Sequence, residues 1–206
     1  PSLARETPQR ERFRAYSLDG ARLYFQPRSG VQVRVQTGAT MALCRVAPRV
    51  VMFGITNACN LRCSFCSRGL HRESRWDLDS AALALEGLAE AGALEVAFGG
   101  GEPFAFPAFA ALIARLHQTT ALAMHVTTNG ALIHQGMWAP LRGLLGQVRI
   151  SIYPEVRWQR AAEVLSAERQ LWGANVLVDD DTLSTLPERL AELTALGCHD
   201  VSLLSY

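Results

Sequence analysis

The sequence contains no lysine, and each of its 20 basic residues is arginine. This absence excludes Schiff-base chemistry and a lysine general base within these 206 residues, because both require a side-chain amine. Charged residues make up 19% of the chain and apolar residues 49%, a balance that excludes a disordered chain and can supply a substantial core. We therefore expect a folded globular protein of one domain, or two at most.

The sequence also has no long apolar run. Its apolar segments are interrupted by Arg, Gly or Pro and are shorter than the roughly 20 residues that cross a bilayer. Nothing in the sequence resembles a signal peptide, so we expect a cytoplasmic protein without membrane association. The chain starts at Pro1, and residues 201–206 have the apolar pattern of a buried strand, so we expect the natural protein to continue past Tyr206.

The charge is distributed unevenly along the chain. Up to Arg75 there are 13 Arg and four acidic residues, a balance of +9; from Trp76 onward there are seven Arg and 15 acidic residues, a balance of −8. Such asymmetry is common on solvated faces as well as around sites for anions. No nucleic-acid-binding module is recognisable, so the arginines by themselves do not indicate binding to nucleic acid.

Residues 1–48 are expected to form a basic arm and a small extension. Residues 1–18 are polar, Arg-rich and without clear periodicity, which predicts a mobile arm. Residues 21–25 and 31–36 alternate apolar and polar side chains around the loop Gln26-Pro-Arg-Ser-Gly30. This pattern is typical of a β-hairpin with a Gly-containing loop.

From residue 49 the pattern changes to repeated strand and helix units. These predict an α/β fold with right-handed crossovers, a curved parallel sheet, and functional loops at the carboxyl ends of the strands. Strands are expected at residues 50–55, 94–98, 122–127, 148–153, 175–178 and 201–206. Helices are expected between Asp77 and Gly92, from Pro107, around residues 138–145 and 158–170, and from a capping box at Thr185 to Gly197.

Three of the five cysteines lie in Cys59-Asn-Leu-Arg-Cys63-Ser-Phe-Cys66, directly after the first expected strand of the parallel sheet. An odd cluster in a chain without secretory features favours metal or redox chemistry over disulfides. Three thiolates on one loop can bind zinc, with His71 as a fourth ligand. They can also bind an iron–sulfur cluster that leaves one iron open. The spacing alone is compatible with both.

A second motif, Phe98-Gly-Gly-Gly-Glu-Pro103, ends the second strand of this sheet. Its glycines allow the backbone to approach a ligand closely, and Glu102 adds an acceptor beside them. A turn of this kind can also be a plain connection from strand to helix. The motif lacks the spacing and the lysine of a phosphate-binding P-loop.

Together, the cysteine motif with its aromatic residue before the third Cys and the sequence Gly100-Gly101-Glu102-Pro103 resemble the radical S-adenosylmethionine (SAM) superfamily. The resemblance covers residues 49–206, while residues 1–48 match nothing known to us. It implies a partial (β/α)6 barrel, here truncated at its C-terminus. It also implies a 4Fe-4S cluster on Cys59, Cys63 and Cys66, with SAM bound to the open iron. An electron from a flavodoxin- or ferredoxin-type donor would split SAM, and the resulting 5′-deoxyadenosyl radical would abstract hydrogen from a substrate.

The resemblance further implies which residues contact the cofactor. Gly100, Gly101 and Glu102 are expected to receive the methionyl amino group, with Pro103 fixing the turn. Asn129 in Thr127-Thr-Asn-Gly130, Ser151 on the fourth strand and Asn175 on the fifth are expected to contact other parts of SAM. Each of these last three could instead be an ordinary polar residue at the end of a strand.

Several other residues have weaker assignments. Tyr153 and Glu155 follow Ser151 and are the residues that we expect to act on the substrate, as a radical relay or in acid–base chemistry. We expect Tyr206 to lie near the barrel mouth, and His71 and Arg72 to be exposed or to belong to the active site. His117 and His125 are expected to have packing roles. Cys44 and Cys198 are expected to be free thiols.

The motifs do not specify the substrate. We expect a peptide, because the hairpin of residues 21–36 could offer an edge strand to an extended chain. A small metabolite and RNA are competing substrates for the same chemistry. A zinc-stabilised binding module that uses the basic arm is the alternative from another class of function. If a cluster and SAM are bound, we expect the Arg-rich extension to lie near these anionic groups.

Overall fold

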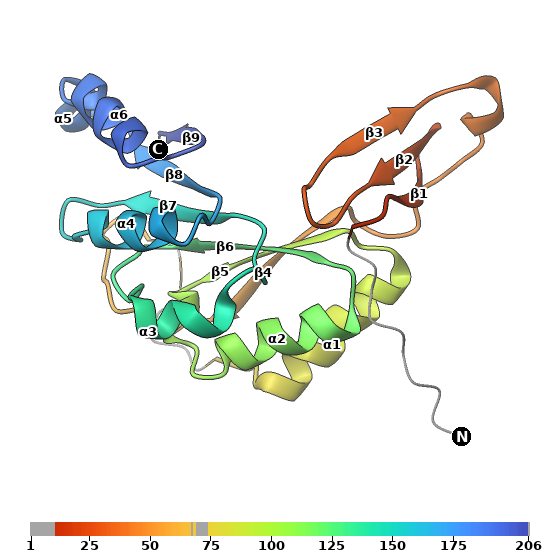
Figure 1. The fold of residues 1–206 in the computed structure, drawn as a ribbon, viewed down its shortest axis with the longest axis horizontal. Coiled ribbons are helices and arrows are strands. Elements are labelled where there is room, and N and C mark those ends of the chain that lie inside the picture. The colour runs from red at the N-terminus through yellow and green to blue at the C-terminus, as the bar shows by residue number, and fades with distance from the viewer. Residues whose placement is uncertain (1–10, 67, 69–73, 206) are drawn as a thin grey trace.

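The computed structural model describes residues 11–66, 68 and 74–205. His71, Arg72 and Tyr206, singled out above, lie outside these residues. The described chain forms a three-stranded antiparallel sheet, in the order β1-β2-β3, and a six-stranded sheet, in the order β4-β5-β6-β7-β8-β9 (Figure 1). The strands are β1 Arg14–Leu18, β2 Ala21–Phe25, β3 Gln32–Val35, β4 Val50–Thr56, β5 Glu95–Gly100, β6 Ala123–Thr128, β7 Val148–Ile152, β8 Trp172–Leu177 and β9 Val201–Leu204.

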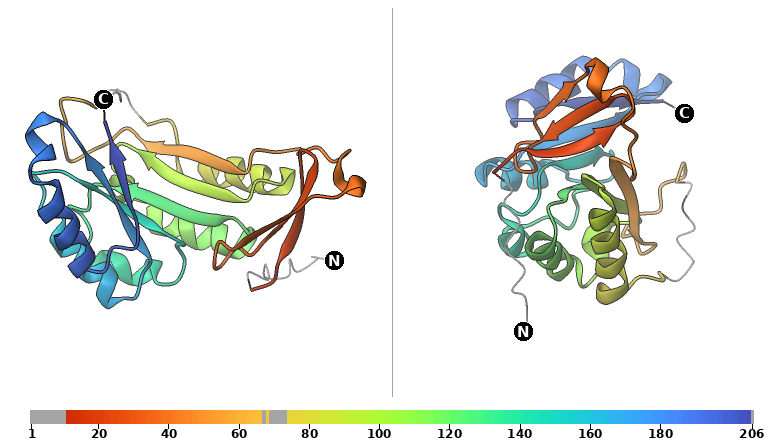
Figure 2. Two further views of the ribbon diagram at one scale, coloured as in Figure 1. Left: turned by 90° about the horizontal axis from the view of Figure 1, so that it is seen from above. Right: turned by 90° about the vertical axis from the view of Figure 1, so that its right-hand side faces the viewer.

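The six-stranded sheet is parallel throughout, and each strand pairs with the next one along the chain. Helices cross over between successive strands and cover the outer side of the curved sheet, as Figures 1 and 2 show. This confirms the expected partial barrel. The helices are α1 Leu78–Ala91, α2 Phe109–Thr119, α3 Gln135–Trp138, α4 Gln159–Ala167, α5 Asp180–Leu183 and α6 Leu186–Ala195, with short 3-10 turns at Gly38–Thr40, Pro103–Ala105 and Ala139–Leu141.

The core lies between the sheet and its outer helices. Phe98 of β5 packs edge-on against Phe53 of β4 and Phe109 of α2, with ring centroids 6.2 and 5.5 Å apart. Each buried Phe of this kind stabilises the fold by about 1.5–3 kcal/mol through the apolar area that it removes from water. Trp138 and Trp172 are also fully buried. The strands that carry the candidate site are thereby held on a rigid layer.

The termini of α1 form as the sequence predicts. Oδ1 of Asp77 accepts a hydrogen bond from the Ser80 amide at 2.8 Å, which caps the first turn. Gly92 ends the helix with φ of +109°, in the left-handed region that glycine adopts most readily. The cysteines precede α1 in the chain, so the Asp77 cap fixes the end of the helix that follows them.

The expected capping box at Thr185 is wrong. The Thr185 hydroxyl donates to the Thr182 carbonyl, and α6 begins at Leu186 without a side-chain cap. A capping box forms instead between Asp179 and Thr182, which opens α5. This cap belongs to a short helix that the sequence analysis did not predict, and Asp179 follows β8 after one intervening residue.

Three expected boundaries also differ from the structure. The short helix lies at Gln135–Trp138, earlier than residues 138–145, because Pro140 stands in a separate 3-10 turn after it. Pro107 precedes α2, which begins at Phe109. The strand expected at residues 175–178 already begins at Trp172, whose side chain is fully buried.

The expected mobile arm is wrong for its last residues. Arg14–Leu18 forms β1 and pairs antiparallel with β2, which turns the predicted hairpin into a three-stranded sheet. Tyr16 and Leu18 pack with the buried Leu23 and Phe25 of β2. Their period-two alternation marks this strand, but the surrounding arginines and polar residues concealed it.

The antiparallel sheet lies at the amino ends of the barrel strands. Its buried residues pack against Leu94 and Ala123, which stand at the starts of β5 and β6. The cysteine loop follows the carboxyl end of β4, so it lies at the other end of the parallel sheet (Figure 1). The described part of the Arg-rich extension is therefore not next to the cysteine site, and for these residues that expectation is corrected. No helix in the described part of the chain is long and apolar enough to span a membrane.

Candidate functional site

A cavity of about 290 Å³ opens at the carboxyl ends of the parallel strands. It brings together the two sequence motifs, which are separated by more than 30 residues along the chain. The lining residues come from the cysteine loop, the end of β5, the end of β6 and β7: Cys59, Leu61, Cys63, Phe65, Cys66, Gly99, Gly100, Gly101, Glu102, Thr127, Thr128, Asn129, Ser151 and Tyr153. Most of the predicted site residues thus share one cavity.

The three cysteines of the motif all line this cavity. Cys59 and Cys63 are half-buried and Cys66 is exposed. The Leu61 amide donates to Sγ of Cys59 at 3.4 Å, and the Cys66 amide donates to the Cys63 carbonyl at 3.1 Å. Burial raises the pKa of the Cys63 thiol, and negative charge on Cys59 and Cys66 raises it further. In the described residues, no three His, Cys, Asp or Glu side chains form a group that could hold a single metal ion.

The glycine motif holds the start of the cysteine loop. The Gly101 amide donates to the Thr56 carbonyl at 2.7 Å, and the Glu102 amide donates to the Ala58 carbonyl at 2.8 Å. A Cβ at Gly101 would lie 2.7 Å from the Ala58 carbonyl carbon, and one at Gly100 would lie 2.5 Å from the Thr56 oxygen. Gly100 also has φ of +116°. These two glycines are thus required by contact between two backbone segments.

Gly99 has a different environment. A Cβ at this position would meet nothing within 4 Å, although the residue lines the cavity. The absence of a side chain there leaves open space beside the cysteines. A bound molecule can therefore approach the backbone of β5 at Gly99, while Gly100 and Gly101 hold the wall in place.

Glu102 is a buried carboxylate with only 1% of its surface exposed. Its Oε1 accepts hydrogen bonds from the Phe104 amide at 3.1 Å and the Thr128 hydroxyl at 2.8 Å, and its Oε2 accepts one from the Asn129 amide at 2.9 Å. A carboxylate has about four acceptor positions, so Oε2 keeps one. Burial raises the pKa of Glu102, and these three hydrogen bonds oppose the rise.

Asn129 connects the end of β6 to the cysteine loop. Its Nδ2 donates to Oδ1 of Asn60 at 2.8 Å, and its Oδ1 accepts from the Ala131 amide at 2.9 Å. Asn60 directly follows Cys59. The Thr-Asn-Gly stretch therefore positions both Glu102 and the residue after the first cysteine.

The polar residues of β7 and β8 lie at the next part of the opening. Ser151 and Asn175 are direct partners in the strand register. Ser151 and Tyr153 line the first cavity, and both also line an adjoining cavity of about 390 Å³ together with Asn175 and Leu177. Burial raises the pKa of Tyr153, and its ring lies 5.5 Å from that of Phe65 in the cysteine loop.

Three predicted site residues lie outside the first cavity's lining. Of the two cavities, Asn175 lines the adjoining one and not the first. Its Oδ1 accepts a hydrogen bond from the Arg149 guanidinium at 3.4 Å. Glu155 is exposed and lines neither cavity, although its charge contributes to raising the pKa of Cys63. Pro103 is buried in the 3-10 turn that Glu102 caps.

Some residues of the site were missed by the sequence analysis. Asn60 lies inside the cysteine motif and Thr128 inside the stretch Thr127-Thr-Asn-Gly130, but spacing alone does not show that their side chains form hydrogen bonds across the fold. Arg68 places its guanidinium against Gly54 and Gly100. No pattern in the sequence indicated this contact, because Arg68 is 14 positions from Gly54 and 32 positions from Gly100 along the chain.

The other candidates have structural surroundings. Nε2 of His125 lies 3.2 Å from Oε2 of Glu95, and its Nδ1 accepts from the Gln147 amide at 3.1 Å. His117 lies on α2, as expected. Cys44 is exposed, and Cys198 donates its thiol hydrogen to the Asp200 carbonyl at 3.0 Å. Both are free thiols outside the cysteine cavity, as expected.

Comparison with known proteins identifies the family. The model of the family described as "Radical SAM superfamily" matches residues 53–165, more than half of the chain. The chain belongs to the radical SAM superfamily. The matched residues include both the cysteine loop and the glycine motif, which confirms the resemblance seen in the sequence.

Two curated relatives of this radical SAM chain are named as cyclases. It is 27% identical to the PqqA peptide cyclase of Gluconobacter oxydans over 175 residues, which cover 76% of the chain and 49% of that relative. It is 32% identical to the GTP 3',8-cyclase of Chlorobaculum tepidum over 107 residues, which cover 50% of the chain and 32% of that relative. The radical SAM chain thus spans about half the length of the first relative and a third of the second.

Solved structures show the same radical SAM fold. Streptococcus suis SuiB matches with a TM-score of 0.75 at 13% identity, over 98% of this chain and 62% of SuiB. Native anSMEcpe with bound AdoMet and Cp18Cys peptide matches with a TM-score of 0.63 at 18% identity, over 76% of this chain and 50% of that one. SuiB bound to S-adenosylmethionine also matches, with a TM-score of 0.75 at 14% identity, over 98% and 63% of the two chains.

Proposed function

We propose that this chain is the core of a radical SAM enzyme that binds a 4Fe-4S cluster through Cys59, Cys63 and Cys66. The observation that carries the proposal is the single cavity that contains these thiols and the glycine motif. The donor set fits by its chemistry, because three thiolates that line one cavity leave one iron of such a cluster without a protein ligand. When bound, the cluster and SAM supply a 5′-deoxyadenosyl radical that takes a hydrogen atom from the substrate, after an electron arrives from a flavodoxin- or ferredoxin-type donor.

The residues opposite the cysteines supply contacts for SAM. The free acceptor position on Oε2 of Glu102 suits a cationic amino group, and the space at Gly99 gives that group access to the backbone. Ser151 and Asn129 add polar groups to the same cavity, and Asn175 adds one to the adjoining cavity. Tyr153 lies between the two cavities, where it can contact both cofactor and substrate.

A peptide is the substrate class that the chain supports best. The adjoining cavity of about 390 Å³ is lined by Phe65, Ser151, Tyr153, Asn175, Leu177, Leu204 and Ser205. None of these described residues is charged, whereas a triphosphate such as GTP is commonly bound by Arg or Lys. PqqA peptide cyclase is named for a peptide, and SuiB has been solved bound to its precursor peptide SuiA. These observations favour a neutral peptide side chain in the cavity over GTP or RNA.

A second part of a peptide could bind at β3. All four residues of this edge strand are exposed, and the backbone of such an edge can pair with an extended chain. Because β3 lies with the antiparallel sheet at the amino ends of the barrel strands, a segment bound there is separate from the segment that reacts. The substrate would then be held at two places.

Anaerobic reconstitution with iron and sulfide tests the proposed activity. We expect a brown protein that, when reduced with dithionite, forms 5′-deoxyadenosine from SAM. Replacement of Cys59, Cys63 or Cys66 by Ala should abolish both colour and product, while Cys44→Ala and Cys198→Ala serve as matched controls that keep both. A colourless protein that retains zinc would overturn the proposal and support the zinc-stabilised binding module, whose fourth candidate ligand, His71, lies outside the described residues.

The substrate class is tested with the same reconstituted protein. Peptides encoded by short open reading frames next to its gene should increase 5′-deoxyadenosine formation and change in mass, whereas GTP should do neither. Stimulation by GTP, with no peptide response, would overturn the peptide assignment while leaving the radical SAM activity in place.

A further inference from the structure

Arg149 lies in β7, on the side of the sheet that carries the candidate site. Side chains two residues apart in a strand share a face, so Arg149 lies on the same face as Ser151, which lines both cavities. In the strand register Arg149 is opposite Gly173 of β8, and Ser151 is opposite Asn175. Arg149 itself lines neither cavity, and the function proposed above assigns no role to it.

The guanidinium of Arg149 reaches across β8 to the start of β9. Its Nη2 donates to both carboxylate oxygens of Asp200, at 2.8 Å each. Its Nη1 donates to the Ala174 carbonyl and to Oγ of Ser202, each at 3.1 Å. Nη1 also donates to Oδ1 of Asn175 at 3.4 Å, the longest of these hydrogen bonds. One side chain therefore contacts β8, β9 and the residue that directly precedes β9.

Gly173 makes room for the carboxylate that holds Arg149. A Cβ at Gly173 would overlap Oδ1 of Asp200 and would lie 3.0 Å from the Asp200 carbonyl oxygen. The position opposite Arg149 in the strand register is thus one without a side chain, and Asp200 occupies the space. Because charge-assisted hydrogen bonds are strong and directional, the two bonds to Asp200 restrict the orientation of the guanidinium.

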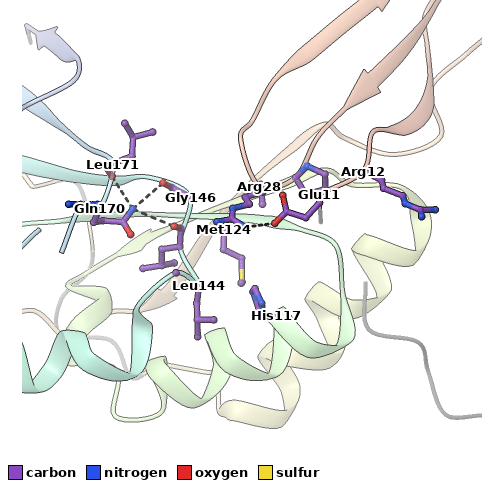
Figure 3. A pocket seen from close by; sticks show the side chains of 14 residues that line it. Glu11, Arg12, Arg28, His117, Met124, Leu144, Gly146, Gln170 and Leu171 are labelled. Atoms are coloured by element: carbon purple, nitrogen blue, oxygen red, sulfur yellow. Dashed lines mark hydrogen bonds and ion pairs between the residues drawn. The ribbon is translucent and has the colours of Figure 1, made fainter. Parts of the chain in front are cut away.

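The strands beside Arg149 are held together by other contacts. Nε2 of the buried Gln170 donates to three backbone carbonyls, those of Gly146 at 3.0 Å, Leu171 at 3.0 Å and Leu145 at 3.4 Å (Figure 3). This amide ties the start of β8 to the loop before β7, and β7 pairs with β8 over its whole length. Loss of the Arg149 guanidinium should therefore leave these strands in place.

The charge on Arg149 decides which end of the Asn175 amide can bind a ligand. Oδ1 lies towards the guanidinium, and a rotated amide would place the Nδ2 hydrogens against a positive charge. Within the described chain, no group accepts a hydrogen bond from Nδ2. Because Asn175 lines the adjoining cavity of about 390 Å³, it offers this cavity a donor.

We propose that Arg149 is a positioning residue for SAM, because it holds Asn175 so that Nδ2 donates to an acceptor atom of the bound cofactor. The nucleoside of SAM has suitable acceptors in its ring nitrogens and ribose oxygens. Arg149 acts through Asn175, since its own Nη1 and Nη2 already donate to protein acceptors. The inference rests on the function proposed above and adds a side chain outside both cavities to its SAM site.

The SAM affinity of the anaerobically reconstituted chain, measured by calorimetric titration, tests this inference. One lost hydrogen bond lowers affinity about five- to tenfold, so Asn175→Ala should weaken SAM binding about tenfold and Arg149→Met about fivefold. Asn175→Asp keeps the size of the side chain but replaces the donor by an acceptor, so it should weaken binding as much as Asn175→Ala. Arg149→Lys keeps a positive charge beside Oδ1 and should retain most of the native affinity.

The double variant shows whether Arg149 acts through Asn175. In the Asn175→Ala background, Arg149→Met has no amide to position, so the double variant should bind SAM as weakly as Asn175→Ala alone. Independent effects would instead multiply to about fiftyfold. Arg142→Met is the matched control, because Arg142 also donates two hydrogen bonds to a carboxylate, that of Glu168, and lines neither cavity.

Iron content and melting temperature separate lost positioning from lost folding. The Asp200 side chain is 51% exposed, so water can solvate it when Arg149 is replaced, and Arg149→Met should match Arg142→Met in both measurements. A native chain that does not bind SAM would overturn the proposed function and this inference with it. If the native chain binds SAM, native affinity in Arg149→Met or Asn175→Asp, or multiplied effects in the double variant, would overturn the inference alone.

Discussion

Nδ2 of Asn129 donates a hydrogen bond to Oδ1 of Asn60 across 2.8 Å, and so joins two residues that are 69 positions apart. The backbone amide of the same Asn129 donates to Glu102. One residue therefore connects the cysteine loop, the glycine motif and the end of β6. The geometry of the proposed cluster site depends on this connection as well as on the cysteines.

Asn60→Ala should loosen the cysteine loop while the barrel stays folded. A partly buried hydrogen bond of this kind contributes about 1 kcal/mol to the free energy of unfolding. We expect a loss of that size in denaturant unfolding and less iron per chain after reconstitution. A double-mutant cycle with Asn129→Ala should give a coupling energy of about 0.5–1.5 kcal/mol. Additive effects of the two substitutions would contradict the role assigned to this contact.

Gly101→Ala and Gly99→Ala should behave differently although they are two residues apart. The added methyl at Gly101 meets the Ala58 backbone, so we expect a loss of about 1–3 kcal/mol in unfolding free energy. The methyl at Gly99 meets nothing within 4 Å and should leave stability nearly unchanged, but it should weaken SAM binding because it enters the cavity. Thermal unfolding and SAM titration measure the two effects. Equal stability of both variants would contradict the close backbone contact assigned to Gly101.

Glu102 should make the stability depend on pH. Because burial raises its pKa above the ordinary value of 4.5, the native state keeps this proton to higher pH than the unfolded state does. Its favourable contribution is therefore complete below about pH 4.5 and is lost as the pH rises through the raised native pKa. Glu102→Gln has no such proton. The unfolding free energy of the native protein minus that of the variant should fall as the pH rises above about 4.5, and a rise would contradict the assignment.

Tyr153→Phe and Glu155→Gln test the two expected substrate-acting residues separately. Tyr153 lines both cavities, so removal of its hydroxyl should lower product formation at least tenfold while iron content stays unchanged. Glu155 is exposed and lines neither cavity, so its neutral variant should change the rate by less than twofold. Product formation is measured by chromatography. Unchanged activity of Tyr153→Phe would remove this residue from the mechanism.

The sequence was informative where local chemistry decides the structure. The strand and helix order from residue 49 followed from periodicity, and the ends of α1 followed from Asp77 and Gly92. Local patterns failed between β8 and β9. Thr185 precedes α6 without capping it, and Asp179 caps α5, a short helix that the sequence analysis did not predict. At residues 14–18 the alternation was hidden by arginines.

The sequence by itself determined the parallel sheet, the position of the cysteine loop at its carboxyl end, and the membership of the radical SAM superfamily through its two motifs. These three features follow from the spacing of motif residues and from the alternation of apolar and polar residues. Both patterns are local, so they can be recognised along the sequence. Only the tertiary structure decided that Asn60 meets Asn129, that Gly101 makes room for the Ala58 backbone, and that the antiparallel sheet β1-β2-β3 lies at the far end of the barrel. Such contacts join distant segments, and their geometry is set by how the whole sheet curves and packs.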